Sequence, residues 1–403
     1  MDKVKSSGVS DGFALELLKL EQLAHPAGNV LVSPLSVSLA LAMLLNGSSG
    51  KTRQSATTAL GFGPGRSRRG INETYSQLRE SLAQSREVDL EMAQSLVAHA
   101  DARIKPNFAN KAQQYFDARI RLLNLEDPSA PVLMNSFICQ KTKGRVPSVL
   151  SELDNPSDFA QMVLLNAVFF RGPWTTPFDR LLTQDEKFSR LDGSKGDCAL
   201  MYRSGTFSYL GNLKFQAVRL PYGESGRFAL YVFLPLAEGF FGLERMLDAL
   251  ADPNDGLSAC FKRFKPSQGR VFLPRFRAEY ASTLNESLKQ LGLGDLFDDE
   301  KGELAAVLKG SAGPRITLKH KTVMEVDEDA RGSELDLKSY SPPRRSHLIM
   351  AGDPFVLRAD RPFCFFVRDD QNETVNIAGF INNPGVLTQN SSRENLLAQT
   401  AKQ

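Results

Sequence analysis

The chain has 403 residues, and its 49 lysines and arginines against 46 aspartates and glutamates give a formal net charge of +3. This near balance does not produce the dense basic face of a nucleic-acid-binding protein, so no nucleic-acid partner is expected. Hydrophobic residues make up 42% of the chain, which is enough to build a core and excludes disorder as the dominant state. No apolar run approaches the ~20 residues that span a bilayer, so no membrane association is expected.

The N-terminal sequence and the cysteine spacing indicate where in or outside the cell the protein is expected to lie. Residues 1–8 lack the apolar core of a secretion signal. A cytoplasmic location is therefore expected for the chain as written, and an extracellular one if the native N-terminus was trimmed. Cys139, Cys198, Cys260 and Cys364 lie far apart and form no CxxC pair. We expect four free thiols rather than a zinc ribbon or a disulfide framework.

The first third of the chain is predicted to be mainly helical. Residues 11–20 carry apolar side chains at helical spacing. Ser33 followed by Pro34 predicts the start of a second helix, because serine is a good N-cap and proline is tolerated in the first turn. Residues 35–45 are apolar almost all round, so this helix is expected to be buried. Further helices are predicted at residues 52–60, 72–83 and 104–116, and a loop at 61–70.

Strand signals dominate after residue 159. Residues 162–170 form a continuous apolar run, which is typical of a strand covered on both faces. The chain shows neither an internal repeat nor a clear linker, so one large α+β domain is expected. Further strands are predicted at residues 217–220, 228–234, 270–273, 321–326, 363–367 and 375–380, and helices at 242–250 and 284–291.

Two regions are predominantly polar. Residues 327–354 are rich in proline and charge and lie between two predicted strands. A connection this long in a compact domain is usually functional or disordered. The tail after Pro384 is also polar and is expected to be frayed.

Short motifs for catalysis are absent from the sequence. Gly50-Lys51-Thr52 resembles the end of a phosphate-binding loop, but Leu45 stands where that motif requires its first glycine. The sequence contains neither a GxSxG nucleophile elbow nor an HExxH zinc motif. We therefore expect a protein that is not an enzyme, with no metal and no cofactor.

A short basic cluster occurs at Arg66, Arg68 and Arg69. Its simplest interpretation is a solvated loop, and the alternative is a contact with a polyanion.

Several motifs in order along the chain resemble the serpin family. The matching segments are residues 29–37 (NVLVSPLSV), 40–43 (ALAM), 50–54 (GKTRQ), 165–174 (LNAVFFRGPW), 220–222 (LPY), 273–276 (LPRF), 291–297 (LGLGDLF), 359–363 (ADRPF) and 378–380 (AGF). The resemblance implies an α+β serpin fold of three β-sheets and about nine helices, with an exposed reactive-centre loop that inserts into the large sheet after cleavage. It implies a single serpin domain over residues 1–384, followed by a polar tail at 385–403.

The resemblance also assigns a polar cluster beneath the large sheet. Ser33, Ser36, Asn166 and His320 match the family's hydrogen-bonded shutter, where the sheet opens, and Trp174 matches the breach at the top of the same opening. A catalytic triad of Ser33 or Ser36 with His320 is the alternative. A buried histidine in such a cluster is better explained as a hydrogen-bonded structural group.

The hinge of the reactive loop departs from the family pattern. The loop is expected at about residues 328–354, with a hinge formed by Glu328, Ala330, Arg331, Gly332 and Ser333. In inhibitory members the corresponding stretch is small and uncharged. Here Arg331 must enter the sheet first, and burying an unpaired charge costs several kcal/mol.

Strand alternation nevertheless favours insertion beyond this arginine. If Arg331 takes the position of the family's hinge threonine, the residues that follow alternate between the inward and the outward face. The inward set is then Arg331, Ser333, Leu335, Leu337, Ser339 and Ser341, and the outward set is Gly332, Glu334, Asp336, Lys338 and Tyr340. The carboxylates and the lysine past the hinge therefore fall on the solvent face.

The scissile bond is predicted to follow an arginine. Counting 17 residues from Glu328 inclusive reaches Arg344, while Arg345-Ser346 is the more family-like bond. An arginine at this position implies a trypsin-like serine protease, whose pocket carries an acid to pair it. The expected partner is such a protease in a covalent complex with a monomeric inhibitor.

Two functions remain open from the sequence. The first is a suicide-substrate inhibitor of a trypsin-like protease, favoured by the arginines and the alternating face. The second is a non-inhibitory serpin with a binding, storage or chaperone role, favoured by Arg331.

Overall fold

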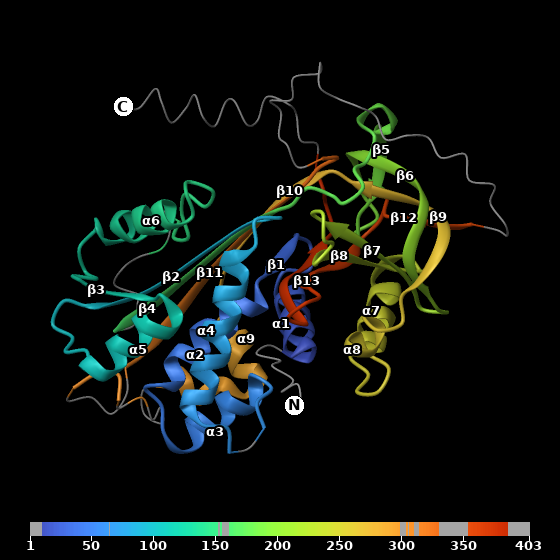
Figure 1. Cartoon of the computed structure of the whole chain (residues 1–403). Coiled ribbons are helices and arrows are strands. Elements are labelled where there is room, and N and C mark those ends of the chain that lie inside the picture. The colour runs from blue at the N-terminus through green and yellow to red at the C-terminus, as the bar shows by residue number, and fades with distance from the viewer. Residues whose placement is uncertain are drawn as a thin grey trace.

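The computed structural model describes residues 10–63, 65–151, 154, 161–298, 304, 306–309, 314–329 and 354–385. Within these residues the chain forms nine α-helices and fourteen β-strands, which confirms the α+β class (Figure 1). The helices are α1 (Asp11–Ala24), α2 (Pro34–Leu45), α3 (Gly50–Ala59), α4 (Arg68–Gln84), α5 (Pro106–Phe116), α6 (Ala130–Lys141), α7 (Gly239–Leu250), α8 (Leu257–Cys260) and α9 (Asn285–Leu288). Among these helices, none combines the length and the hydrophobicity that a membrane crossing requires.

The strands form two hydrogen-bonded networks. Their bounds are β1 (Val30–Val32), β2 (Asp89–His99), β3 (Arg119–Leu123), β4 (Met162–Arg171), β5 (Gln184–Ser189), β6 (Lys195–Gly211), β7 (Phe215–Tyr222), β8 (Phe228–Pro235), β9 (Lys265–Pro274), β10 (Phe276–Thr283), β11 (Ile316–Val326), β12 (Phe355–Arg358), β13 (Phe363–Asp369) and β14 (Thr374–Ile381). The smaller network is a five-stranded sheet in the order β10-β11-β4-β2-β3. The larger follows the order β1-β14-β13-β8-β7-β6-β9-β12, with β5 paired to β6. The second and third sheets of the expected fold are thus joined, because β6 pairs with β5, β7 and β9.

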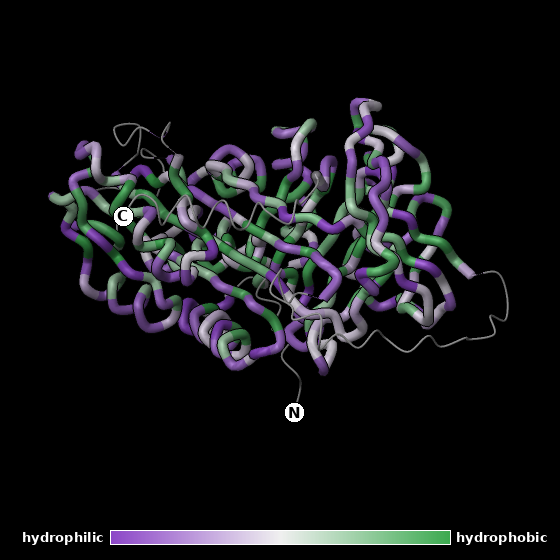
Figure 2. The backbone as a smooth tube through the Cα atoms, turned by 90° about the horizontal axis from the view of Figure 1, so that it is seen from above, coloured by the Kyte–Doolittle hydropathy of each residue, from purple (hydrophilic) through white to green (hydrophobic). Residues whose placement is uncertain are grey.

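The five-stranded sheet is covered on both faces. Helix α6 lies over one face, while α2, α4 and α5 lie on the other (Figure 1). Strand β4 shows why its sequence is continuously apolar, since nine of its ten residues are buried. Leu165 and Phe169 pack with the α6 side chains, whereas Leu164 and Val168 join the larger core. Seen from above, hydrophobic and hydrophilic stretches alternate along the chain, and many of the outer turns are hydrophilic (Figure 2).

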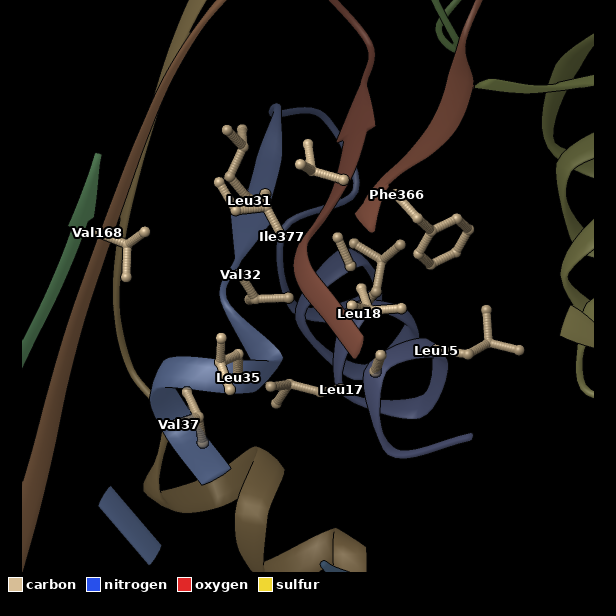
Figure 3. Packing of buried hydrophobic residues seen from close by; sticks show 14 of the residues in the cluster. Leu15, Leu17, Leu18, Leu31, Val32, Leu35, Val37, Val168, Phe366 and Ile377 are labelled. Carbon is tan, nitrogen blue, oxygen red and sulfur yellow. The ribbon is translucent and has the colours of Figure 1, made fainter. Parts of the chain in front are cut away.

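The N-terminal elements α1, β1 and α2 contribute many residues to the main hydrophobic core. Ser10 caps α1 by accepting a hydrogen bond from the Phe13 amide at 3.0 Å. Figure 3 shows leucines of α1 packing against β1 and against the strands β13 and β14. Helix α2 starts where the sequence predicts, with Ser33 as its N-cap, Pro34 in its first turn and every residue buried.

Several boundaries differ from the sequence prediction; strand β11, for example, begins at Ile316 and not at residue 321. Two of the differences change the type of structure that a segment forms. Helix α4 begins at Arg68, so the last three residues of the predicted 61–70 loop are helical. The predicted helix at 284–291 is broken, because α9 ends at Leu288 and the following turn contains Gly292 at φ 81°. That left-handed conformation is accessible to glycine and ends the regular helix.

Candidate functional site

The candidate site is the seam between β4 and β11. These strands run parallel and pair directly over nine residues, from Met162 opposite Ile316 to Phe170 opposite Met324. Strand β4 is the central strand of the five-stranded sheet, and β11 lies between it and the edge strand β10. The described chain therefore presents a closed seam, and any new strand between them must first separate the pair.

A buried polar cluster ties the middle of this seam to helix α2. Asn166 on β4 lies directly opposite His320 on β11, and its Oδ1 accepts from Ser36 Oγ at 2.6 Å. The Asn166 amide donates in return to the Ser36 carbonyl at 2.8 Å. Ser33 Oγ donates to the Asn376 carbonyl at 2.7 Å. All four predicted shutter residues are fully buried and in mutual contact.

The hydrogen bonds fix the tautomer of His320. Its Nε2 receives the Ser33 backbone N–H at 3.0 Å, so this nitrogen must be an acceptor. Nδ1 therefore carries the proton and donates to Asn166 Oδ1 at 3.0 Å. Burial lowers the pKa of His320 to about 3, which keeps the ring neutral at physiological pH. This bond crosses the seam and must break when β4 and β11 separate.

This geometry does not support the catalytic triad alternative. A catalytic histidine must accept the proton of a serine hydroxyl. Here His320 instead accepts a backbone N–H, while the hydroxyls of Ser33 and Ser36 donate elsewhere. Both hydroxyl groups belong to residues with no exposed surface, so a substrate could not reach them.

A second group of contacts closes the upper end of the seam. The indole Nε1 of Trp174 donates to the Asp327 carbonyl at 2.7 Å, and its ring stacks on Tyr222 at 4.3 Å. Arg171, at the end of β4, pairs with Asp327 at 2.9 Å and with Glu325 at 3.6 Å. Side chains of β4 and of the loop after it thus hold the segment that leaves β11.

The two acidic residues that follow the half-buried Asp327 are buried and paired. Glu328 is 2% exposed, accepts from Thr183 Oγ1 at 2.8 Å and lies 3.6 Å from Arg275. Asp329 is 8% exposed and pairs with Arg180 at 2.9 Å. Buried carboxylates require such partners because removal from water is otherwise costly. We call Asp327, Glu328 and Asp329, with their arginine partners, the acidic latch.

Most of the predicted hinge and cleavage residues lie outside the described residues. Of the hinge set, the structure places Glu328, whereas Ala330, Arg331, Gly332 and Ser333 fall beyond Asp329. The scissile candidates Arg344, Arg345 and Ser346 also lie outside the described residues. Their roles remain predictions from the sequence.

The basic cluster is largely engaged in local contacts. Arg68 Nε donates to the Leu45 carbonyl at 3.3 Å, and Arg66 donates to a threonine of α4 at 3.3 Å. Arg69 is the most exposed of the three and pairs with Glu73 at 2.7 Å. The polyanion contact therefore stays a prediction.

Sequence reasoning missed the partners of the latch. Arg171, Arg180 and Arg275 come from three separate segments, and no local motif links them. A signal was nevertheless present, because three consecutive acidic residues directly after a buried strand require cations nearby.

Comparisons with known proteins agree with this geometry. A family model described as Serpin (serine protease inhibitor) matches residues 9–384. The corticosteroid-binding globulin of Pongo abelii is 28% identical, over 89% of this chain and 85% of its own. The protein Z-dependent protease inhibitor of Rattus norvegicus is 27% identical, over 94% and 85% of the two chains. A solved Arabidopsis serpin in its native stressed conformation has a TM-score of 0.84 at 24% identity, covering 95% of this chain and 99% of its own.

Proposed function

This chain belongs to the serpin family, and on that premise we propose that it inhibits a trypsin-like serine protease as a suicide substrate. The observation that carries the proposal is the closed β4–β11 seam, with a hydrogen-bonded cluster across its middle and a latch at its upper end. If the contacts across such a seam break and β4 and β11 separate, the five-stranded sheet can accept a sixth strand between them.

The topology of the seam favours insertion of the chain that follows β11. A segment that turns back after Val326 runs antiparallel to both β11 and β4, because these two strands are parallel. Insertion thus replaces one parallel ladder by two antiparallel ladders, and parallel pairing is slightly less stable per residue. The added hydrogen bonds and buried apolar surface make the inserted state the more stable one.

The proposed trapping step begins as ordinary proteolysis. The protease serine attacks the carbonyl carbon of Arg344 or Arg345, the bond to the following nitrogen breaks, and an acyl ester remains. Insertion of the freed loop must then occur before water hydrolyses this ester. Each ~1.4 kcal/mol added to the insertion barrier slows it about tenfold, so the residue that enters first has a large influence.

The second candidate is a non-inhibitory serpin. Arg331 favours it, because the guanidinium must enter the sheet or find a carboxylate during insertion. The match to a corticosteroid-binding globulin also favours it, because that relative is named for binding a ligand rather than for inhibiting a protease. Under this proposal the loop is cleaved without trapping the enzyme.

The deciding experiment mixes the protein with trypsin at equal concentration and resolves the products on a denaturing gel. A covalent band near the summed masses supports the inhibitor. A cleaved product with active trypsin counts against inhibition of trypsin, and its melting temperature then identifies the reason. A large rise over the intact protein indicates insertion that is too slow, and an unchanged melting temperature supports the non-inhibitory candidate.

Variants separate the roles of the arginines. Arg344→Ala and Arg345→Ala, made singly, identify the scissile bond by the loss of the covalent band. Arg331→Thr is expected to increase trapping sharply if the hinge charge slows insertion. An unchanged yield of covalent band from Arg331→Thr would show that this charge does not control the outcome.

A further inference from the structure

Apolar side chains gather on the surface around the start of helix α7. Phe240 and Phe241 are both at least half exposed, and no other phenylalanine of the described residues is exposed. Leu213, in the turn between β6 and β7, is 93% exposed, and Leu236, directly after β8, is also exposed. We call these four residues the α7 patch. An exposed apolar patch commonly marks a surface that binds another segment of protein.

The α7 patch is held in place by the ends of strands β6, β7 and β8. The Leu236 amide donates to the Lys214 carbonyl at 3.0 Å, which brings the segment before α7 against the β6–β7 turn. Asn212 Oδ1 accepts from the amides of Lys214 and Phe215 at 2.8 and 3.0 Å, which fixes the conformation of that turn. The inner face of α7 is buried and includes Leu243. The patch is therefore the outer surface of an anchored structure.

The described residues end beside this patch. Strands β8 and β14 both pair antiparallel to β13, so they run in the same direction and finish at the same edge of the sheet. Phe363 on β13 lies opposite Ile381 on β14. Arg361, two residues earlier, donates to the Pro235 carbonyl at the end of β8 at 3.0 Å. The end of β14 thus lies two strand spacings, about 10 Å, from the end of β8, where the patch begins.

The segment after Gly385 has the sequence pattern of a short amphipathic helix. Ser391 and Glu394 have the spacing of a capping box, in which each side chain bonds the backbone N–H of the other residue. The less polar side chains after this box share one helical face: Leu396, Leu397, Thr400 and Ala401. A flexible chain of the 15 residues from Gly385 to Thr400 spans roughly 20 Å, which is enough to reach the patch.

The charges of the two segments are complementary. The exposed residues of α7 and its N-cap combine three carboxylates with one arginine and carry a net negative charge: Glu238, Glu244, Asp248 and Arg245. The side chains of residues 391–403 carry a net positive charge, from Arg393 and Lys402 against Glu394. Opposite charges around an apolar contact favour one partner over others.

We propose that residues 391–403 bind the α7 patch of the same molecule as an amphipathic helix. Its leucines cover Phe240 and Phe241, and its opposite face stays in water. Burial of these apolar side chains favours the contact, and the covalent link through Gly385 supplies a high effective concentration. The contact does not involve the β4–β11 seam and is therefore independent of the proposed inhibition.

Disulfide trapping in the full chain tests the contact. All variants carry Cys139→Ser, because Cys139 is the partly exposed thiol, whereas burial raises the pKa of the other three thiols and keeps them unreactive. Glu244→Cys, on the exposed face of α7, is combined with Thr400→Cys. Mild oxidation is expected to join this pair within one molecule, which mass spectrometry of a protease digest detects.

A pair of Ala27→Cys with Thr400→Cys is the matched control. Ala27 is exposed, and its carbonyl accepts from the Asn382 side chain at 2.9 Å, so it lies beside the end of β14. A segment that only diffuses would react with this nearer position at least as fast as with α7. Under the proposal the Glu244→Cys pair forms its disulfide at least about tenfold faster than the control pair. Equal rates, or a faster control, would overturn the proposal.

Further changes test the apolar contact in the Glu244→Cys pair. Phe240→Ser with Phe241→Ser, and separately Leu397→Ser, should each lower the rate to that of the control pair. Leu181→Ser changes an exposed leucine outside the patch and should leave the rate unchanged. Melting temperatures show whether the domain is intact, and if the phenylalanine variant is destabilised, Leu397→Ser still tests the contact.

Two further outcomes would refute the proposal. One is a rate that neither set of serine substitutions changes, because the contact would then not depend on the apolar side chains. The other is a disulfide between two molecules, seen as a band of twice the mass whose yield rises with protein concentration. That result would assign the segment to the patch of a second copy.

Discussion

His320 combines complete burial with a hydrogen bond to each ring nitrogen. Burial lowers its pKa in the folded protein from the ordinary 6.5 to about 3. Below pH 6.5 the unfolded chain therefore binds a proton that the folded chain does not. The stabilisation present above pH 6.5 is thus lost as the pH falls towards 3, by about 1.4 kcal/mol per pH unit.

His320→Gln is predicted to remove this pH dependence while keeping a polar side chain in the cluster. Urea unfolding measured at successive pH values checks it, with the variant losing less stability than the parent on acidification. His99→Gln is the matched control, because His99 is a partly exposed histidine outside the cluster. If His320→Gln and the parent show parallel pH profiles, His320 does not contribute the acid sensitivity.

At the scale of elements, β13 and β14 depend on a glycine. Gly379 on β14 lies opposite Phe365 on β13, and a Cβ at this position would meet Phe365 Cζ at 2.2 Å. The ring thus packs directly over the backbone, as a strand glycine permits. Gly379→Ala is predicted to destabilise the protein by about 1–3 kcal/mol, because a buried overlap must be relieved by displacing the ring.

Thermal unfolding of the intact variant checks the predicted loss. Gly63→Ala is the control, because a Cβ there meets nothing within 4 Å. A Gly379→Ala protein as stable as the parent would mean that the two strands adjust without cost.

The sequence predicts the longer elements whose burial is uniform, whereas the short, fully buried β1 was missed. Residues 162–170 coincide with β4 within one residue, and Ser33-Pro34 marks the start of α2. Strands β2 and β10 were missed, although β10 shows a regular alternation of buried and exposed residues. Polar residues interrupt the apolar ones in both strands, and on β2 two of them, Gln94 and Ser95, are buried and bonded to backbone carbonyls, so the hydrophobic signal is diluted. Helix α6 was missed because its apolar residues are not confined to one face.

The site was predictable to different degrees in its two parts. Ser33, Ser36 and Asn166 lie in the family motifs at residues 29–37 and 165–174, and the same resemblance assigns His320. The structure places all four together. For the latch, the sequence predicts only that cations lie nearby, because buried acidic residues need them. It does not predict which cations these are. Arg171, Arg180 and Arg275 meet because the tertiary fold brings distant segments to one end of the sheet. That arrangement has no counterpart in local sequence spacing.

At the scale of the whole molecule, the two networks of strands differ in the role that the proposed mechanism gives them: one is a stable frame and the other opens. The larger network contains the strands β13, β8 and β7 of the main core, and its ladders, which are antiparallel except for β12–β9, give a stable frame. The five-stranded sheet contains the parallel seam, which is held by polar contacts at the middle and the upper end. No ladder joins the two networks among the described strands, so the seam can open without breaking a ladder of the larger network, and the five-stranded sheet can serve as the moving part of the proposed inhibitor.

The proposed insertion makes a register prediction that tests this division. In the expected register, Leu335 and Leu337 point inward, whereas Glu334 and Asp336 point to solvent. Leu335→Ser and Leu337→Ser should each reduce the stability gained on loop cleavage by about 1.5–3 kcal/mol, the value of a buried leucine side chain. Glu334→Ser and Asp336→Ser are the matched controls and should change that gain little.

The measurement is the difference in unfolding free energy between the cleaved and the intact form of each variant. The unfolding free energy of the intact form should be the same in all four variants. The loss of stability is therefore expected only in the cleaved form. A loss that follows the acidic positions instead of the leucines would place the loop in the opposite register and bring Glu334 and Asp336 into the core. An equal response of both sets would mean that the cleaved loop does not become a strand of the sheet, which would favour the non-inhibitory candidate.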